Sequence, residues 1–162
     1  MLRLAAIATA LMLSVPAWAA EDELKGVALV IGESKYETLS ELVNPNQDAR
    51  DIDNLLGDLG FDVDRVLNAD AEELREAIAD FIENAEGADV ALVYYSGHGI
   101  EVGGENYLVP VDTDFASPWK AGEALVAVAP MLEELAKIVP VTIVLLDACR
   151  TDPFPAGTAI QL

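Results

Sequence analysis

The stretch VALVYYSGHG, residues 90–99, begins like a buried strand and ends in a way that core packing does not require. Residues 90–95 are apolar, β-branched or aromatic, which is the composition of a strand covered on both faces. The run then ends in Ser96-Gly97-His98-Gly99, which sets the one histidine of the chain between two glycines. The pattern predicts a strand that ends near residue 95 and presents His98 just beyond its carboxyl end.

The rest of the chain alternates signals for strands and helices around this segment. Short apolar runs bounded by glycine or polar residues predict strands, and apolar residues at helical spacing predict amphipathic helices. This alternation is typical of an α/β fold with a mostly parallel sheet and helices on both faces. In chain order we predict a strand at 26–32, a helix at 47–59, a strand near a sheet edge at 61–66, a helix from a capping pair at Asp70 and Glu73 to about residue 87, the strand at 88–95, a hairpin at 100–110, a helix in the second half of 124–139 and a strand at 141–146.

Residues 1–19 have the composition of a secretory signal peptide. Arg3 gives a positive start, residues 4–15 are almost wholly apolar, and Pro16 precedes a small-x-small sequence. The apolar run is too short to cross a bilayer stably as a helix, so no stable membrane anchor is expected. We therefore expect an exported protein, periplasmic or secreted, with a signal peptide at 1–19, a single domain at 25–154 and a tail at 155–162.

The chain is strongly acidic, with 29 acidic and 9 basic residues and a net charge of −20. Binding to nucleic acid needs a basic face that this composition does not offer, so we expect no nucleic-acid partner. The acidity has two interpretations, which are solubility and attraction of cationic substrates by the summed field of the protein.

Cys149 is the one cysteine, so no disulfide forms within the chain. A lone thiol in an exported protein is a liability unless it is buried or used. Cys149 comes just after the strand predicted at 141–146, and ligands of parallel sheets collect at the carboxyl ends of the strands. If that strand neighbours the one at 88–95, at a spacing of about 4.8 Å, Cys149 and His98 meet at one edge of the sheet.

A cysteine and a histidine that meet in this way indicate acyl transfer through a thioester. The thiolate is the nucleophile, and the imidazole stabilises it and later protonates a leaving amine. Gly97 and Gly99 would let the backbone adopt conformations denied to other residues and let the main chain of a substrate come close. Taken singly, His98 could be a hydrogen-bonded loop histidine and Cys149 an inert buried thiol.

Metal binding is the competing interpretation of these residues. One cysteine and one histidine fall short of the four ligands of a structural zinc site, so we expect no metal there. A site for a hard cation built from Asp and Glu stays open as an alternative, although no calcium-loop spacing occurs in the sequence.

Two blocks of the sequence, YYSGHG at 94–99 and LLDACR at 145–150, resemble the signature blocks of caspase-like cysteine peptidases, closest to bacterial metacaspase-like members. LVNPNQDA at 42–49 and LGFDV at 59–63 also resemble the first βαβ unit of that family. The resemblance spans roughly residues 26–154. It implies the three-layer caspase-like α/β fold.

The resemblance also implies a cysteine endopeptidase and assigns its residues. His98 would be the general base and acid, Cys149 the nucleophile, and the backbone N–H groups of Gly99 and Cys149 the oxyanion hole. Asp48 and Asp147 match acidic positions that line the primary specificity pocket of the metacaspase and paracaspase branches. Two carboxylates in one cleft favour a guanidinium, so the expected substrates are proteins or peptides cut after Arg or Lys, and an acidic side chain would be repelled.

The two pocket residues also have plainer interpretations. Asp48 in a first helical turn is favoured by the helix dipole whatever its function. Asp147 could simply cap the loop that follows its strand.

The sequence departs from the family pattern in three places. RTDPF at 150–154 follows the nucleophile where eukaryotic metacaspases usually have His-Ser-Gly. The calcium-binding acidic segment of several metacaspases does not align well with residues 101–114, so no cofactor is expected and calcium activation is the open alternative. The family fold continues past the nucleophile with about two further strands, so we expect an edge left open to a partner chain or to self-association. A catalytically inactive caspase-like binding or regulatory module is the alternative function.

Overall fold

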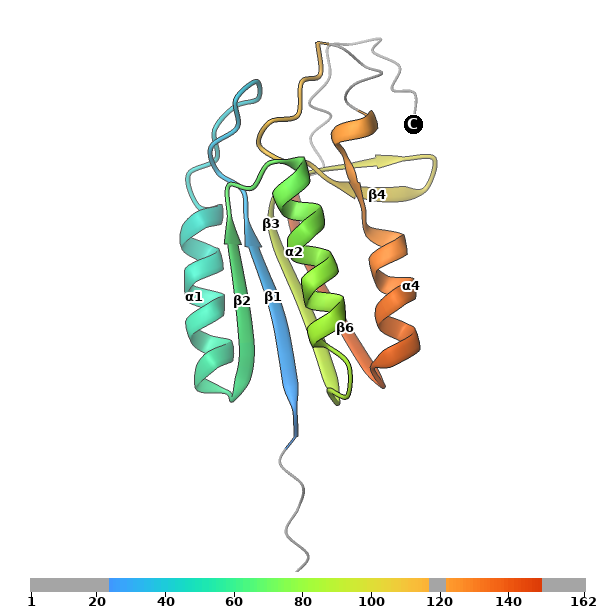
Figure 1. The fold of residues 1–162 in the computed structure, drawn as a ribbon. Coiled ribbons are helices and arrows are strands. Elements are labelled where there is room, and N and C mark those ends of the chain that lie inside the picture. Colours follow the sequence, from blue (N-terminus) through green and yellow to red (C-terminus); the bar gives the residue numbers. More distant parts are fainter. Residues whose placement is uncertain (1–23, 117–121, 150–162) are drawn as a thin grey trace, which may run out of the picture.

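The computed structural model describes residues 24–116 and 122–149 of the chain. The centre of the fold is a parallel sheet in which β1 (Gly26–Gly32) lies between β2 (Phe61–Leu67) and β3 (Val90–Val102) (Figure 1). β6 (Val141–Cys149) pairs with the other side of β3. The predicted parallel sheet is confirmed, and β2 lies at its edge as its alternating sequence predicted.

Helices cover both faces of this sheet, which makes three layers (Figure 1). α1 (Pro45–Asp58) packs on one face, and α2 (Ala71–Asn84) and α4 (Val128–Ile138) pack on the other. The three predicted helices are confirmed, with ends that differ by a few residues. α1, α2 and α4 lie along the faces of the sheet, and the loops gather at the carboxyl ends of the parallel strands (Figure 1).

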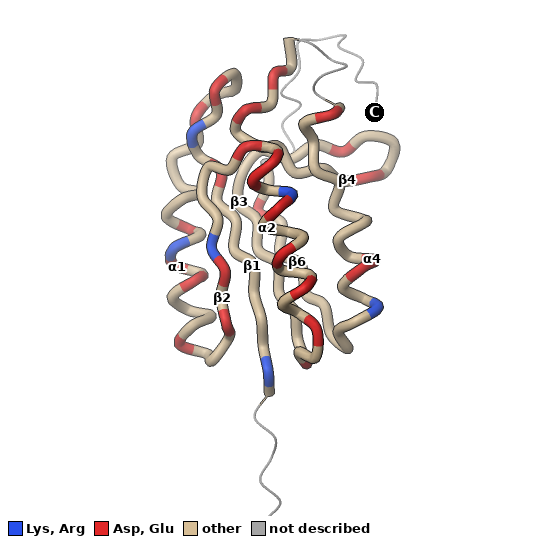
Figure 2. The backbone as a smooth tube through the Cα atoms, in the orientation of Figure 1, with Lys and Arg blue, Asp and Glu red and all other residues tan. Residues whose placement is uncertain are grey.

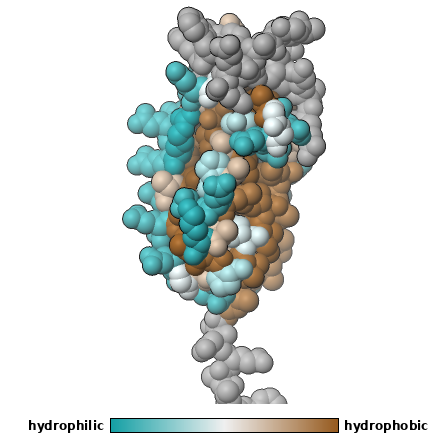
Figure 3. Space-filling model, turned by 90° about the vertical axis from the view of Figure 1, so that its right-hand side faces the viewer, coloured by the Kyte–Doolittle hydropathy of each residue, from teal (hydrophilic) through white to brown (hydrophobic). Residues whose placement is uncertain are grey.

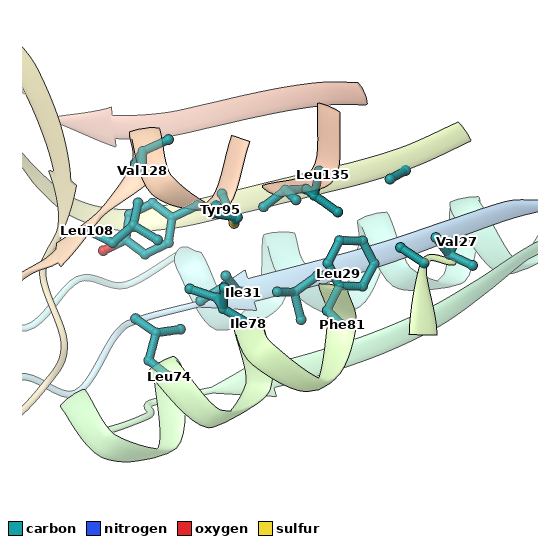
Figure 4. Close-up of a cluster of buried hydrophobic side chains, with 14 of the residues drawn as sticks. Val27, Leu29, Ile31, Leu74, Ile78, Phe81, Tyr95, Leu108, Val128 and Leu135 are labelled. Carbon is teal, nitrogen blue, oxygen red and sulfur yellow. The ribbon is translucent and has the colours of Figure 1, made fainter. Parts of the chain in front are cut away.

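Alternation along β1 divides the hydrophobic core between the two faces. Leu29 and Ile31 lie on the face covered by α2, where they pack in one cluster with Phe81 (Figure 4). Ala28 and Val30 lie on the opposite face and pack against α1. Successive side chains of a strand point to opposite faces, so a strand covered on both sides reads as one continuous apolar run. Accordingly, β1 is buried along its whole length.

β3 is longer than predicted and extends the sheet into an antiparallel part. Residues 99–102 pair with β4 (Glu105–Leu108), and β4 pairs with β5 (Val126–Ala127). Gly103 and Gly104 both have positive φ at the turn, a backbone conformation that other residues adopt at a cost. The predicted hairpin is thus confirmed, and the described residues form a mixed six-stranded sheet.

The predicted end of the third strand near residue 95 is wrong. β3 stays extended because β6 pairs with it as far as His98 and β4 pairs with it from Gly99 onward. Strand pairing therefore continues through Ser96 and Gly97, which were expected to lie beyond the end of the strand. His98 lies within a strand. Cys149 was expected beyond a strand that ended at residue 146, but it is the last residue of β6.

Local sequence signals account for the helix starts. The Asp70 side chain accepts hydrogen bonds from the backbone N–H groups of Glu72 and Glu73, and the Glu73 side chain accepts one from the Asp70 N–H. This reciprocal capping box begins α2 and confirms the predicted capping pair. α1 has no side-chain cap and begins with Pro45, whose fixed φ and missing N–H suit a first helical position.

The predicted signal peptide at 1–19 and the predicted tail at 155–162 lie outside the described residues. The described part covers the predicted domain at 25–154 as far as Cys149, apart from residues 117–121. Within these ranges no helix is long and apolar enough to cross a membrane.

One side of β6 exposes apolar side chains. The side chains of Val141, Ile143 and Leu145 are 47, 39 and 47% exposed. Figure 3 looks at the side of the molecule that carries β6 and α4, and it shows a continuous apolar area there. On the face of the sheet that α1 covers, this helix packs against β1, β2 and β3. Within the described residues β6 pairs with β3 alone. The edge of β6 expected to be open is therefore unpaired in this part of the chain.

Candidate active site

The sheet brings His98 and Cys149 together from distant parts of the sequence. In the parallel pairing of β3 and β6 they are register partners, and the preceding partners are Gly97 with Ala148 and Ser96 with Asp147. Neighbouring strands of a sheet lie about 4.8 Å apart. The prediction that the two strands are neighbours is confirmed, and the backbone places these two residues side by side at the carboxyl edge of the parallel sheet.

The imidazole of His98 is held by one ring nitrogen. Its Nε2 lies 3.0 Å from the carbonyl oxygen of Ser40, in the loop that follows β1. A carbonyl oxygen only accepts hydrogen bonds, so Nε2 carries the proton and Nδ1 of the neutral ring is left as an acceptor. Nδ1 is buried and has no hydrogen-bond partner among the described residues. A basic nitrogen is therefore available at this position.

Two tyrosines hold the main chain of His98, and neither was predicted as a site residue. The His98 N–H donates to the Tyr36 hydroxyl at 2.8 Å, and the Tyr95 hydroxyl donates to the His98 carbonyl at 2.5 Å. The Tyr36 ring also packs on the imidazole, with ring centroids 4.5 Å apart. The one signal in the sequence is that Tyr36 follows a strand whose carboxyl end lies at the same edge of the sheet.

One of the two purposes predicted for the glycines beside His98, an unusual backbone conformation, is wrong, and the other, close approach of the main chain of a substrate, stays a prediction. The glycines with positive φ in the described residues all lie elsewhere, so neither Gly97 nor Gly99 needs an unusual backbone conformation. Both are needed for space instead. A Cβ at position 97 would lie 2.6 Å from the Tyr95 hydroxyl, and one at 99 would lie 2.8 Å from the Ala148 Cβ. Gly99 thus allows β3 to lie close to β6 at Ala148, the residue before Cys149.

Asp48 and Asp147, both predicted as pocket residues, line one pocket. Asp48 comes from the first turn of α1 and Asp147 from β6, and Ser96 and Gly97 of β3 lie between them. The pocket has a volume of about 220 Å³, and residues 42–45 form the rest of its wall. The structure therefore brings together two carboxylates separated by most of the chain, directly beside the strand that carries His98.

Tyr94 is a buried residue of β3 that was not predicted as part of the site, although both pocket carboxylates influence its hydroxyl. Burial raises the pKa of its hydroxyl, a hydrogen bond with Ser96 opposes this, and the charges of Asp147 and Asp48 raise the pKa further. One phenol thus interacts with both carboxylates, which shows that their negative potentials overlap. A cation in this pocket would be attracted by both.

Glu33 is a buried carboxyl at the end of β1. It is 0% exposed, its Oε1 accepts a hydrogen bond from the Ala69 N–H at 3.1 Å, and its Oε2 has no partner among the described residues. Burial raises the pKa of Glu33 to about 8, the Ala69 N–H lowers it, and nearby Glu73 and Asp112 raise it. The Glu33 side chain is therefore mostly neutral at pH 7.

The described residues include no group of three or more His, Cys, Asp or Glu side chains that could hold a metal ion. Within that part of the chain, the pocket carboxylates Asp48 and Asp147 have no third such side chain beside them. What distinguishes the site is one imidazole, one cysteine and two carboxylates at the same edge of a parallel sheet.

This fold and this set of residues define a caspase-like α/β domain. Residues 25–161 match the caspase domain, and the chain belongs to that family of cysteine peptidases, as the two sequence blocks predicted. The chain is 32% identical over 126 residues to the human protein named Mucosa-associated lymphoid tissue lymphoma translocation protein 1. Its mouse homologue matches to the same extent. These matches cover 76% of this chain and 15% of each relative, so the chain spans a small part of their length.

A solved structure shows the same fold. The crystal structure of a protein from Geobacter sulfurreducens superimposes with a TM-score of 0.60, over 77% of this chain and 50% of that one. The two sequences are 21% identical, and at this level the similarity concerns the fold alone.

Proposed function

We propose that the protein is a cysteine endopeptidase that cleaves peptide bonds after Arg or Lys. The observation that carries the proposal is the register pairing of His98 with Cys149 on neighbouring parallel strands. The adjoining pocket between Asp48 and Asp147 supports the choice of a basic residue before the cleaved bond. Membership of the caspase-domain family supports the class of reaction.

In the proposed acylation step the Cys149 thiol attacks the carbonyl carbon of the substrate and its proton passes to His98. Nδ1 is the nitrogen available to receive it, because Nε2 donates to the Ser40 carbonyl. The oxyanion that forms would be stabilised by the backbone N–H groups of Gly99 and Cys149. The C–N bond then breaks, His98 returns the proton to the leaving amine, and a thioester remains.

In the proposed deacylation step water attacks the thioester. His98 takes a proton from the water, the C–S bond breaks, and the proton returns to the departing thiolate as the carboxylic acid product leaves. The Ser40 carbonyl would stabilise the imidazolium in both steps, since it accepts from the Nε2–H that persists when the ring is charged. The scheme needs only groups of the chain and water.

The proposed specificity follows from charge. Acidic residues are spread over α1, α2 and the loops beyond the strand ends, with few basic ones among them (Figure 2). Together with the net charge of −20, this field attracts cationic peptides. At the pocket itself a guanidinium can bond to both Asp48 and Asp147, whereas an acidic side chain would face two like charges.

The first test compares the protein with Cys149→Ala and His98→Ala on fluorogenic peptides that end in Arg, Lys or Asp. We expect the wild type to cleave the Arg and Lys peptides, and each variant to lose on the order of 10³-fold or more in kcat/KM. Lys137→Ala, an exposed change on α4, is the control and should cleave at the wild-type rate.

Equal rates for the wild type and both variants would exclude the peptidase. A thiol-reactive peptide probe ending in Arg separates the two candidate functions if turnover is slow. Labelling of the wild type but not of Cys149→Ala supports the enzyme, and binding of the peptide without labelling or turnover supports an inactive binding module. Repeating the assay with added calcium and with a chelator shows whether calcium activates the protein.

Asp48→Asn tests the pocket. Removal of one carboxylate should lower kcat/KM for Arg peptides about tenfold, which corresponds to about 1.4 kcal/mol. The matched control is Asp58→Asn, which makes the same change at an exposed position of the same helix. An unchanged preference for Arg over uncharged peptides in Asp48→Asn would show that this pocket does not select the substrate.

Export is the proposed destination of the protein, because residues 1–19 have a signal-peptide composition. Expression of the full chain in a bacterium should give a product outside the cytoplasm whose first residue is Ala20. A cytoplasmic product that still begins at Met1 would contradict this proposal.

A further inference from the structure

The peptide of His98 lies where the sheet changes partners, from β6 to β4. In a regular sheet the N–H and C=O of such a residue would both bond to neighbouring strands. Here the His98 N–H donates to a side chain, the hydroxyl of Tyr36, at 2.8 Å. The His98 carbonyl accepts the Tyr95 hydroxyl at 2.5 Å and the Val109 N–H at 3.2 Å. Side-chain hydroxyls thus replace part of the backbone ladder at the residue proposed as catalytic base.

We propose that Tyr36 and Tyr95 are positioning residues that together fix the peptide and ring of His98 for catalysis. The inference rests on the proposed peptidase function for its kinetic part. Its structural part, the restraint of the imidazole, can be measured without any activity.

The two hydroxyls and the His98 peptide close a ring of hydrogen bonds. The Tyr36 oxygen accepts from the His98 N–H, and it lies 3.5 Å from the Tyr95 oxygen, which in turn donates to the His98 carbonyl. Since the Tyr95 proton is directed to His98, the Tyr36 proton is the one left to bridge the two oxygens. Burial raises the pKa of both phenols, so they remain neutral donors at ordinary pH.

The imidazole ring of His98 is held by contacts of its own, in addition to those of its backbone. Tyr36 is 5% exposed, and its ring packs on the imidazole at a tilt of 55°. The Ser40 carbonyl, in the same loop as Tyr36, accepts a hydrogen bond from Nε2 of the imidazole. The loop after β1 therefore holds both the peptide and the ring of His98, which sets the direction of Nδ1.

Gly97 supports the same inference, because a side chain at this position would collide with the two hydroxyls. A Cβ at this position would lie 2.6 Å from the Tyr95 oxygen and 2.8 Å from the Tyr36 oxygen. No Cβ tolerates such distances, so any other residue would push one or both hydroxyls away from the His98 peptide. The glycine before His98 therefore makes room for the two tyrosines.

The test uses Tyr36→Phe and Tyr95→Phe, which keep the packed rings and remove the hydroxyls. Tyr107→Phe is the matched control, since Tyr107 is half-buried on β4 and makes none of these hydrogen bonds. His98 is the only histidine, so its ring signals in an NMR spectrum need no further assignment. Relaxation of the ring carbons gives an order parameter, and a rigid ring has a value near that of rigid backbone, about 0.85.

We expect an order parameter near this value in the wild type and in Tyr107→Phe, and a clearly lower one in both hydroxyl-deleted variants. In the peptide assay kcat should fall on the order of tenfold to a hundredfold with KM unchanged, because misplacement of a reacting group affects the chemical step. Unchanged folding of each variant is checked by its thermal midpoint.

An imidazole that stays as rigid in both variants as in the wild type would overturn the inference, and so would a mobile imidazole with unchanged kcat. A general loss of folding would instead lower the thermal midpoint of a variant. In that event the ring relaxation is measured at lower temperature on Gly97→Ser and Gly97→Ala. An imidazole as rigid in both as in the wild type would also overturn the inference. If the wild type cleaves no peptide, the proposed function fails, and the ring measurement alone still decides whether the tyrosines restrain His98.

Discussion

At the scale of single residues, the candidate site depends on groups that separate segments contribute to one histidine. Ser40 and Tyr36 come from the loop after β1, and Tyr95 comes from β3 itself. Their hydrogen bonds use every polar group of His98 except Nδ1, which is the nitrogen needed as a base. The hydrogen bond of Nε2 thus selects the tautomer in which Nδ1 can accept a proton.

Glu33 gives a prediction at this scale. Its pKa is 4.5 in the unfolded chain and is raised to about 8 by burial in the fold. Below pH 4.5 both states hold the proton, and between these values only the folded state does, so the free energy of unfolding should fall as the pH rises through this range. At about 1.4 kcal/mol per pH unit, the loss from this group is on the order of 4 kcal/mol by pH 8.

Glu33→Gln should keep the Ala69 hydrogen bond and remove this pH dependence, so it should be more stable than the wild type at pH 8. Urea unfolding at several pH values between 4 and 9 measures the effect. Glu76→Gln, which removes one charge from an exposed position of α2, is the control. Parallel curves for the wild type and Glu33→Gln would show that the carboxyl is ionised in the fold.

At the scale of secondary-structure elements, start signals in the sequence decide where the helices begin, and strand pairing decides where the strands end. α2 begins at the Asp70 capping box, which involves residues close in sequence. β3 continues beyond its apolar run because β6 and β4 pair with it in succession. Local signals are readable from sequence, whereas partners from distant segments are not.

Asp70→Ala should lower the free energy of unfolding by about 1 kcal/mol, because it leaves two N–H groups of the first turn of α2 without their acceptor. Asp70→Asn, which keeps an acceptor, should lose less. Urea unfolding followed by circular dichroism measures both, and Asp80→Ala, at an exposed position later in α2, is the control. A stability of Asp70→Ala equal to that of the control would mean that the cap does not stabilise α2.

At the scale of the whole molecule, two properties oppose each other. The net charge of −20 repels a second copy, while the side chains of Val141, Ile143 and Leu145 expose an apolar strip along β6, which is an edge strand within residues 24–116 and 122–149. Unpaired strand edges favour pairing with another chain. Whether copies associate therefore depends on how far salt screens the charge.

We propose weak self-association through β6 that increases with salt. Raising the ionic strength from about 0.01 M to 0.5 M shortens the Debye length from about 30 Å to a few ångströms, which removes most of the repulsion. Sedimentation velocity should show a larger associated fraction at high salt, and Ile143→Lys should remain monomeric. Asn54→Lys makes the same charge change on the exposed side of α1 and should associate like the wild type. Monomers at both salt concentrations would contradict the proposal.

The sequence by itself determined the order of the elements, the parallel sheet and the family. Apolar runs and helical spacing depend on which faces of each element are buried, and these patterns are local. The placement of His98 beside Cys149 could be predicted because parallel strands end at one edge of a sheet. The shared pocket of Asp48 and Asp147 was expected from the resemblance to the family alone.

Only the tertiary structure decided how His98 is held. Tyr36, Ser40 and Tyr95 act through hydrogen bonds between segments that no periodicity connects, and the need for Gly97 appears only once two hydroxyls are seen against it. The raised pKa of Glu33 likewise depends on elements that fold over it from elsewhere in the chain. Periodicity shows that a residue is buried, but its neighbours, and so its hydrogen bonds and charge state, are determined by how distant segments pack.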